Sequence, residues 1–267
     1  MGVRRKLETA SEPRIGRISH MSRIGVLSLL VALIAGSGHA GAKADSPFVV
    51  RQKSFTSSGR KVLVDVYRPT AAGRHTPILV LHGAGGMLFD GPEMSRVAAQ
   101  LARAGFEAYQ VHYFDRTHTW YARQAVLLKL FPTWRATVGD AVKWVHAQRP
   151  EAPKVGIFGY SLGAFAAIET ARRDPSIGAI VEEAGGFWHG HPEGPTQQPL
   201  PPMLVIHGTA DTRVPNEKYT QPLLEYLLAH DDPYEQRFYP GEGHELSTKA
   251  AAKVRKEAVE FFARHLP

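Results

Sequence analysis

The sequence contains no cysteine. This absence excludes disulfide bonds, thiolate metal sites, a cysteine nucleophile and the lipid-modified cysteine of lipoproteins. A long apolar run is also missing. The strongest one, residues 24–35, has twelve residues, fewer than the roughly 20 that cross a membrane as a helix. No G-K-[ST] sequence occurs, and no acidic residue stands where a dinucleotide fingerprint requires one, so the glycine-rich segments do not predict a nucleotide site.

An excess of acidic residues is likewise absent, because 32 Lys and Arg stand against 25 Asp and Glu, a net charge of +7. Residues 1–44 hold seven basic and two acidic residues, a net charge of +5, which leaves +2 for the remainder. The body of the chain therefore lacks the positive excess that suits a polyanion, and we expect no nucleic-acid partner.

Residues 1–44 have the form of an N-terminal extension followed by a secretory signal peptide. The apolar run follows a basic segment and precedes a cleavage site of A-x-A type at residues 42–44, with residues 38–40 as a second candidate. A start at Met21 instead of Met1 would give a leader of ordinary length. We expect export to the periplasm or the cell exterior, and a mature chain that begins near Asp45 and does not enter the membrane. An uncleaved N-terminal anchor is the alternative.

Residues 45–267 have the pattern of a single catalytic domain of α/β class. Alternating apolar residues in 48–56 and 61–67 predict an antiparallel hairpin. Further strands are predicted at 78–81, 106–113, 154–158, 177–182, 203–206 and 234–239. Helices are predicted at 94–104, 132–148, from the 159–163 turn to 173, at 216–230 and at 247–265. This order predicts a mostly parallel central sheet with helices on both faces, while residues 115–131 fit no simple crossover.

Residues 154–166, KVGIFGYSLGAFA, combine a short apolar strand, a G-x-S-x-G turn and a helix of small residues. This is the setting of a nucleophile elbow, in which a serine occupies a strained turn between strand and helix. Gly159 and Gly163 lie two residues either side of Ser161, where strand and helix leave no room for a Cβ atom. The pattern predicts Ser161 as the nucleophile. A serine that only caps the helix is the alternative.

A serine nucleophile needs a base to take its proton and a carboxylate to orient that base. In elbow folds the chain order is serine, acid, histidine. Asp211 and His244 follow Ser161 in this order, each in a loop directly after a predicted strand, where open α/β sheets gather ligands. We predict Asp211 as the acid and His244 as the base. Glu242 is a rival acid, but its place two residues before His244 favours a role in shaping the loop.

Two backbone N–H groups are required to stabilise the oxyanion that forms during acyl transfer. One is predicted at Leu162, the residue after the nucleophile. The other is predicted in the glycine-rich loop that follows strand 78–81, where Ala84 is the first choice and Gly83 the alternative.

Three aromatic residues are candidates for the substrate pocket. Trp120 lies in residues 117–131, a segment that either overhangs the site as a cap or packs on the core as a helix. Tyr160 adjoins the nucleophile, and Trp188 lies in a polar loop with His189 and His191. These two histidines have no identifiable third ligand, so we expect no metal site.

The motifs at residues 82–83, 159–163, 207–215 and 243–244 together resemble those of the α/β-hydrolase superfamily, and most closely its dienelactone hydrolase-like branch. The resemblance extends from about Ser46 to the end of the chain. It implies a compact hydrolase that acts on small-molecule esters or lactones without metal or cofactor. Dienelactone hydrolase itself uses a cysteine nucleophile where this chain has Ser161, which implies a general serine carboxylesterase instead.

Two alternatives stay open. Serine peptidases and amidases of the same superfamily carry similar His-Gly-x-x-Asp and Gly-His segments, although they usually have a large additional domain. A binding protein that keeps the hydrolase fold without catalysis is the second alternative. Such a protein would be free to lose Ser161 or His244, and both are present.

Overall fold

The structure is a computed structural model that describes residues 46–73, 75–192, 194 and 199–266. These residues belong to one compact unit, which spans 44–267. The predicted signal peptide lies outside the described residues. Within the described residues, no helix is long and apolar enough to cross a membrane.

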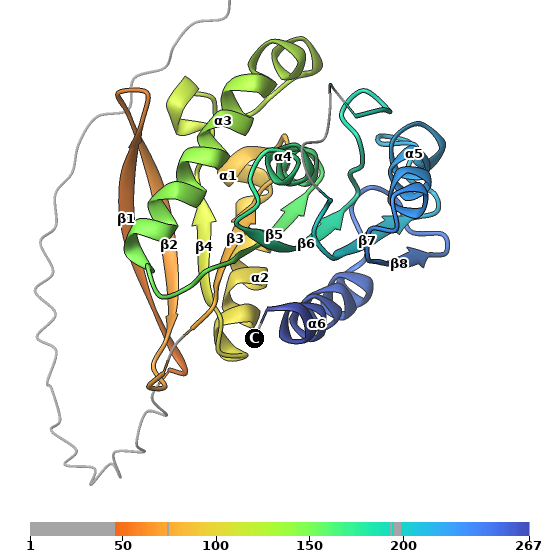
Figure 1. Cartoon of the computed structure of the whole chain (residues 1–267). Coiled ribbons are helices and arrows are strands. Elements are labelled where there is room, and N and C mark those ends of the chain that lie inside the picture. The colour runs from red at the N-terminus through yellow and green to blue at the C-terminus, as the bar shows by residue number, and fades with distance from the viewer. Residues whose placement is uncertain (1–45, 74, 193, 195–198, 267) are drawn as a thin grey trace, which may run out of the picture. The chain divides into compact units, whose positions relative to one another are not determined.

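Eight strands of the described part form a single sheet (Figure 1). They are β1 (Phe48–Ser57), β2 (Arg60–Pro69), β3 (Pro77–Leu81), β4 (Glu107–Val111), β5 (Val155–Tyr160), β6 (Ile177–Glu183), β7 (Met203–Gly208) and β8 (Tyr234–Tyr239). The helices are α1 (Gly86–Phe89), α2 (Gly91–Arg103), η1 (a 3-10 helix, Asp115–Thr117), α3 (Gln124–Gln148), α4 (Leu162–Ala171), α5 (Asn216–Ala229) and α6 (Thr248–His265).

The strand order in the sheet is β1-β2-β4-β3-β5-β6-β7-β8. The strands β1 and β2 form an antiparallel hairpin, and β2 pairs antiparallel with β4. All remaining neighbours are parallel. The predicted sheet and its N-terminal hairpin are therefore confirmed. The carboxyl ends of β3, β5, β6, β7 and β8 meet at one edge, where the predicted site residues lie.

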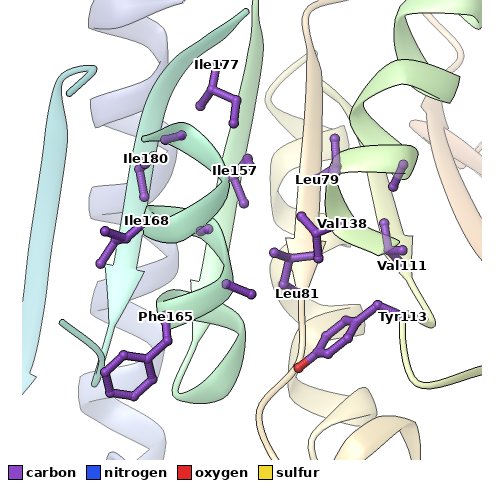
Figure 2. Packing of buried hydrophobic residues seen from close by; sticks show 14 of the residues in the cluster. Leu79, Leu81, Val111, Tyr113, Val138, Ile157, Phe165, Ile168, Ile177 and Ile180 are labelled. Carbon is purple, nitrogen blue, oxygen red and sulfur yellow. The ribbon is translucent and has the colours of Figure 1, made fainter. Parts of the chain in front are cut away.

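Two apolar layers cover the sheet, one on each face. Leu79, Ile157 and Ile180 face α3, α4 and α5, and Figure 2 shows them packed with Val138, Phe165 and Ile168 from two of these helices. On the other face, α2 and α6 cover alternate residues of the same strands, such as Ile78, Phe158 and Val181. Parallel strands with both faces buried are expected to be continuously apolar, as β3 is.

The helix α3 differs from its prediction. It begins at Gln124, eight residues before Pro132, and continues through this proline. Proline lacks the N–H that a helix interior requires, so it favours the first turn. The sequence signal therefore pointed to a start at Pro132. In the structure Pro132 is exposed, and the apolar residues before it, including Leu127 and Phe131, pack against the core. That packing outweighs the lost hydrogen bond.

The turn between β5 and α4 is packed backbone against backbone. A Cβ atom on Gly159 would lie 2.4 Å from the carbonyl oxygen of Gly163. One on Gly163 would lie 2.5 Å from the carbonyl oxygen of Leu81 in β3. Backbone atoms cannot rotate away as a side chain would, so only glycine fits at either position.

We therefore predict that Gly163→Ala lowers the free energy of unfolding by about 1–3 kcal/mol through overpacking. A matched control is Gly139→Ala in α3, where no atom lies within 4 Å of the added Cβ. It should raise the free energy of unfolding by about 0.5–1 kcal/mol, because alanine favours a helix interior. Urea denaturation measures both values. Equal effects of the two substitutions would contradict the packing described for the turn.

Candidate active site

Ser161 occupies a strained turn at the carboxyl end of β5. Its backbone angles are φ 52° and ψ −117°, in the positive-φ region that L-residues rarely adopt. The Ser161 N–H donates a 2.7 Å hydrogen bond to the carbonyl oxygen of Glu183 at the end of β6. Strained backbone of this kind persists only where the surrounding structure holds it, as sheet and helix do here.

The structure brings the three predicted side chains into one hydrogen-bonded line. The Ser161 hydroxyl donates to Nε2 of His244 across 2.9 Å, and Nδ1 of His244 donates to Oδ2 of Asp211 across 2.7 Å. All three residues are buried, with exposed fractions of 8% for Ser161, 8% for His244 and 6% for Asp211. This geometry suits proton transfer from the serine to a histidine that a carboxylate holds in one tautomer.

The carboxylate of Asp211 is held from several directions. Its Oδ1 accepts hydrogen bonds from the N–H groups of Arg213 (2.8 Å) and Val214 (2.9 Å). Burial by itself would raise the pKa of Asp211. The hydrogen bonds from Val214, His244 and Arg213 outweigh it and lower the pKa below the ordinary value. Asp211 is therefore ionised at neutral pH and can stabilise a protonated His244.

A second histidine, His207, also faces Asp211. Its Nε2 lies 2.9 Å from the carbonyl oxygen of Val214 and 3.2 Å from Oδ2 of Asp211. Two acceptors face this nitrogen, so it carries the proton, and Nδ1 accepts from the hydroxyl of Thr220 on α5 (2.8 Å). Burial lowers the pKa of His207, which keeps it neutral. His207 thus joins the Asp211 loop to α5. Glu242, the rival acid, bonds instead to the N–H and hydroxyl of Ser247 (2.7 and 2.6 Å).

Two backbone N–H groups beside Ser161 have no acceptor among the described residues. Leu162 is the first residue of α4, where an N–H has no partner within the helix. The N–H of Ala84 likewise makes no hydrogen bond with the described residues. Both residues line the same cavity as Ser161. These are the two groups that the sequence predicts for an oxyanion.

The loop that carries Ala84 is fixed by Asp90. The Asp90 carboxylate accepts from the N–H of Gly85 (2.9 Å) and also from the N–H of Gly83. Burial raises the pKa of Asp90 to about 6, while the two N–H groups oppose that shift. His82, at the start of the loop, stacks on Tyr113 with ring centroids 4.2 Å apart, and burial lowers its pKa to about 4. A neutral, stacked His82 fits a structural role.

Two hollows meet at Ser161. The first, which we term the apolar cavity, has a volume of about 410 Å³ and lies between α3, α4 and α5. Its walls include Leu127, Phe165, Trp188 and Tyr219, together with the polar residues Gln124, His189, Arg213 and Lys218. Trp188 stacks on Phe131 with ring centroids 4.0 Å apart. This stacking holds the Trp188 ring in its position on the cavity wall. The predicted pocket residue Trp188 therefore lies beside the nucleophile.

The second hollow, which we term the outer cleft, has a volume of about 810 Å³ and contains both Ser161 and His244. The other two predicted pocket residues, Trp120 and Tyr160, line it. Trp120 is 67% exposed. The Tyr160 side chain is buried, and its hydroxyl donates a 3.3 Å hydrogen bond to the carbonyl oxygen of His244.

Several lining residues were missed from the sequence. The first turns of α3 contribute Gln124, Leu127 and Leu128 to the apolar cavity, while the apolar side of α3 packs on the core. Part of residues 117–131 thus lines the site, as predicted for a cap, and part packs on the core, as predicted for a core helix. The sequence around Tyr219 on α5 has no motif that would mark it as a pocket residue. Leu127 could have been found from the helical spacing that continues from residue 124 into α3.

Comparison with known proteins identifies the class. The sequence model of the Dienelactone hydrolase family matches residues 63–266. The fold is the α/β-hydrolase fold, and the chain belongs to the dienelactone hydrolase family. The predicted family is confirmed, and membership supports hydrolase activity.

Solved structures with low sequence identity share this fold. A dienelactone hydrolase-like promiscuous phosphotriesterase from metagenomic libraries is 18% identical, with 83% of this chain and 100% of that chain covered and a TM-score of 0.70. The dienelactone hydrolase of Anabaena variabilis is 20% identical over 83% and 100% of the chains, with a TM-score of 0.63. A cold-adapted esterase from an Arctic intertidal metagenomic library is 17% identical over 83% and 95%, with a TM-score of 0.64.

Glu182 is a fully buried carboxyl group near the carboxyl end of β6. Its Oε2 accepts a 2.9 Å hydrogen bond from the N–H of Gly185, and its Oε1 has no partner among the described residues. Burial raises the pKa of Glu182 to about 8 from an ordinary 4.5, although the Gly185 bond opposes this shift. The folded protein therefore keeps a proton at neutral pH that the unfolded chain releases.

This difference in proton binding between the folded and unfolded states predicts that the free energy of unfolding falls as pH rises. Between about pH 5 and pH 8 the folded state binds more protons than the unfolded state at Glu182, so each pH unit lowers the free energy of unfolding by up to about 1.4 kcal/mol. Glu182→Gln should reduce the measured slope by this contribution, and Glu260→Gln on the exposed side of α6 should leave the slope unchanged. Denaturation at several pH values measures the slope. An unchanged slope in Glu182→Gln would contradict the assignment.

Proposed function

We propose that the protein is a serine hydrolase that cleaves carboxylic esters or lactones through an acyl-enzyme at Ser161. His244 takes the proton of the Ser161 hydroxyl as Oγ attacks the acyl carbonyl. Asp211 holds the imidazole and stabilises its protonated form, and the N–H groups of Ala84 and Leu162 stabilise the oxyanion. His244 then protonates the leaving alcohol. Water, activated by the same base, releases the acid.

The observation that carries this proposal is the continuous line from Ser161 through His244 to Asp211, at 2.9 and 2.7 Å. The strained turn at Ser161 adds weight, because a residue that served only to cap a helix would not need a positive φ. The N–H groups of Ala84 and Leu162, which have no acceptor among the described residues, supply the oxyanion donors that acyl transfer also requires.

The two hollows suggest how an ester would lie. His244 must reach the leaving oxygen, and His244 lines the outer cleft, so the alcohol portion belongs there. The acyl chain then occupies the apolar cavity, next to the N–H groups of Ala84 and Leu162. At about 410 Å³ this cavity suits short or medium acyl groups.

We predict that the mature protein hydrolyses p-nitrophenyl butyrate and that Ser161→Ala lowers kcat by several orders of magnitude, since no other group replaces the nucleophile. Ser54→Ala, on the exposed strand β1, is the matched control and should keep parental activity. Release of p-nitrophenol at 25 °C measures both. Comparable activity in the parent and Ser161→Ala would contradict the proposal. The amide of the same acid, assayed alongside, tests the peptidase and amidase alternative.

We also propose that the protein is exported and that cleavage leaves a mature chain beginning near Asp45. The support is the basic, apolar and small-residue pattern of residues 1–44. Mass spectrometry of the protein from the native host tests it. A chain that retains residues 28–35 would indicate an N-terminal anchor instead.

A further inference from the structure

A third hollow adjoins the outer cleft. It has a volume of about 380 Å³, and we term it the acidic cavity because its walls hold four acidic residues, Asp90, Glu93, Glu183 and Glu245, against two basic ones, Arg96 and Arg255. It lies against α2 and α6, on the opposite face of the sheet from the apolar cavity. The acidic cavity and the outer cleft share Asp90, Tyr160 and Glu245, together with Phe89. A ligand in the outer cleft can therefore extend a group into the acidic cavity.

Glu183 is the buried carboxyl group of this cavity. Side chains alternate between the faces of a strand, so Glu183 points to the same face as Ala179 and Val181, towards α2 and α6. Glu183 is 8% exposed, and its carboxyl group has no hydrogen-bond or ion-pair partner among the described residues. Burial raises the pKa of Glu183 to about 8, and Glu93 adds to the shift while Arg255 opposes it.

The other charges of the cavity are already paired. Glu93 binds Arg96 across 2.9 Å and also binds Arg255. Glu245 binds Arg213 across 2.6 Å.

Asp90 is bound only by backbone N–H groups. Among the described residues, Asp90 and Glu183 thus have no direct ion pair with a cationic side chain, although Arg255 in the cavity wall lowers the pKa of Glu183 and Arg213 lowers that of Asp90. Burial keeps the Glu183 carboxyl group protonated at neutral pH when no cation is bound. A ligand cation beside it would stabilise the ionised form, so binding would release the Glu183 proton to water.

The chemistry of the walls favours an organic cation over a metal ion. Among the described residues, no three His, Cys, Asp or Glu side chains lie close enough together to hold a metal. Tyr160 and Phe89 offer aromatic rings beside the carboxyl groups, and such rings attract alkylammonium ions. We propose that the acidic cavity binds an alkylammonium group on the alcohol portion of an ester substrate, with Glu183 as its principal carboxyl partner.

We assign the cation to the alcohol portion of the ester, because His244 donates its proton to the leaving oxygen of that portion. The outer cleft holds His244 and shares a wall with the acidic cavity, while the apolar cavity lies on the other side of Ser161. This inference rests on the proposed function and specifies its substrate class as esters of amino alcohols.

The test compares two butyrate esters of the same shape. One is choline butyrate, and the other carries a tert-butyl group in place of the trimethylammonium group. In the parent protein, kcat/KM for the choline ester should exceed that for the uncharged ester about tenfold or more. Glu183→Gln should bring this ratio close to one, and Glu260→Gln should leave it unchanged. The ratio within each variant cancels differences in the amount of active protein.

A binding measurement separates the inference from the catalytic proposal. Calorimetry with the Ser161→Ala protein should detect binding of free choline, and addition of Glu183→Gln should weaken it about tenfold or more. If Glu183→Gln does not fold, Asp90→Asn takes its place in the binding experiment only, because Asp90 also fixes the loop that carries Ala84.

Equal hydrolysis of the two esters, with no choline binding, overturns the inference and leaves the hydrolase proposal intact. Failure to hydrolyse p-nitrophenyl butyrate as well as both of these esters contradicts the hydrolase proposal, and choline binding by the Ser161→Ala protein then supports or overturns the cation site by itself.

Discussion

The site depends on one strained turn. Ser161 sits at a positive φ because its N–H is tied to the carbonyl oxygen of Glu183 in β6. The glycines on either side let α4 approach β3 and β5 without intervening side chains. A larger residue at Gly159 or Gly163 would push the helix away from the sheet. The position of the Ser161 hydroxyl, and with it the N–H of Leu162, therefore follows from backbone packing and not from the side chain itself.

The parallel sheet then assembles the rest of the site around this turn. Asp211 and His244 come from loops after β7 and β8, and the Ala84 loop follows β3. Because these strands run in one direction, their carboxyl ends meet at one edge, and residues far apart in sequence come within hydrogen-bond distance. Asp90 and His207 hold two of these loops in place, the first through the N–H groups of Gly83 and Gly85 and the second through Thr220 on α5.

Local motifs explain how much the sequence could predict. The strand, turn and helix around Ser161 lie within one short segment, and the order of Asp211 and His244 is set by the fold, so both were accessible without coordinates. The start of α3 was predicted wrongly, because Pro132 carries a strong helix-start signal that core packing overrides. The acidic cavity had no sequence signal. Asp90 and Glu183 lie on distant segments and share a wall only after α2 and α6 cover the sheet.

The proposed function requires Ser161 to be an activated nucleophile. Its most direct test is reaction of the purified protein with a fluorophosphonate, followed by peptide mass spectrometry and an esterase assay on the same sample. We expect a single adduct on Ser161 and a loss of ester hydrolysis in proportion to labelling. An adduct on another residue, or full hydrolysis by protein that is completely labelled at Ser161, would contradict it.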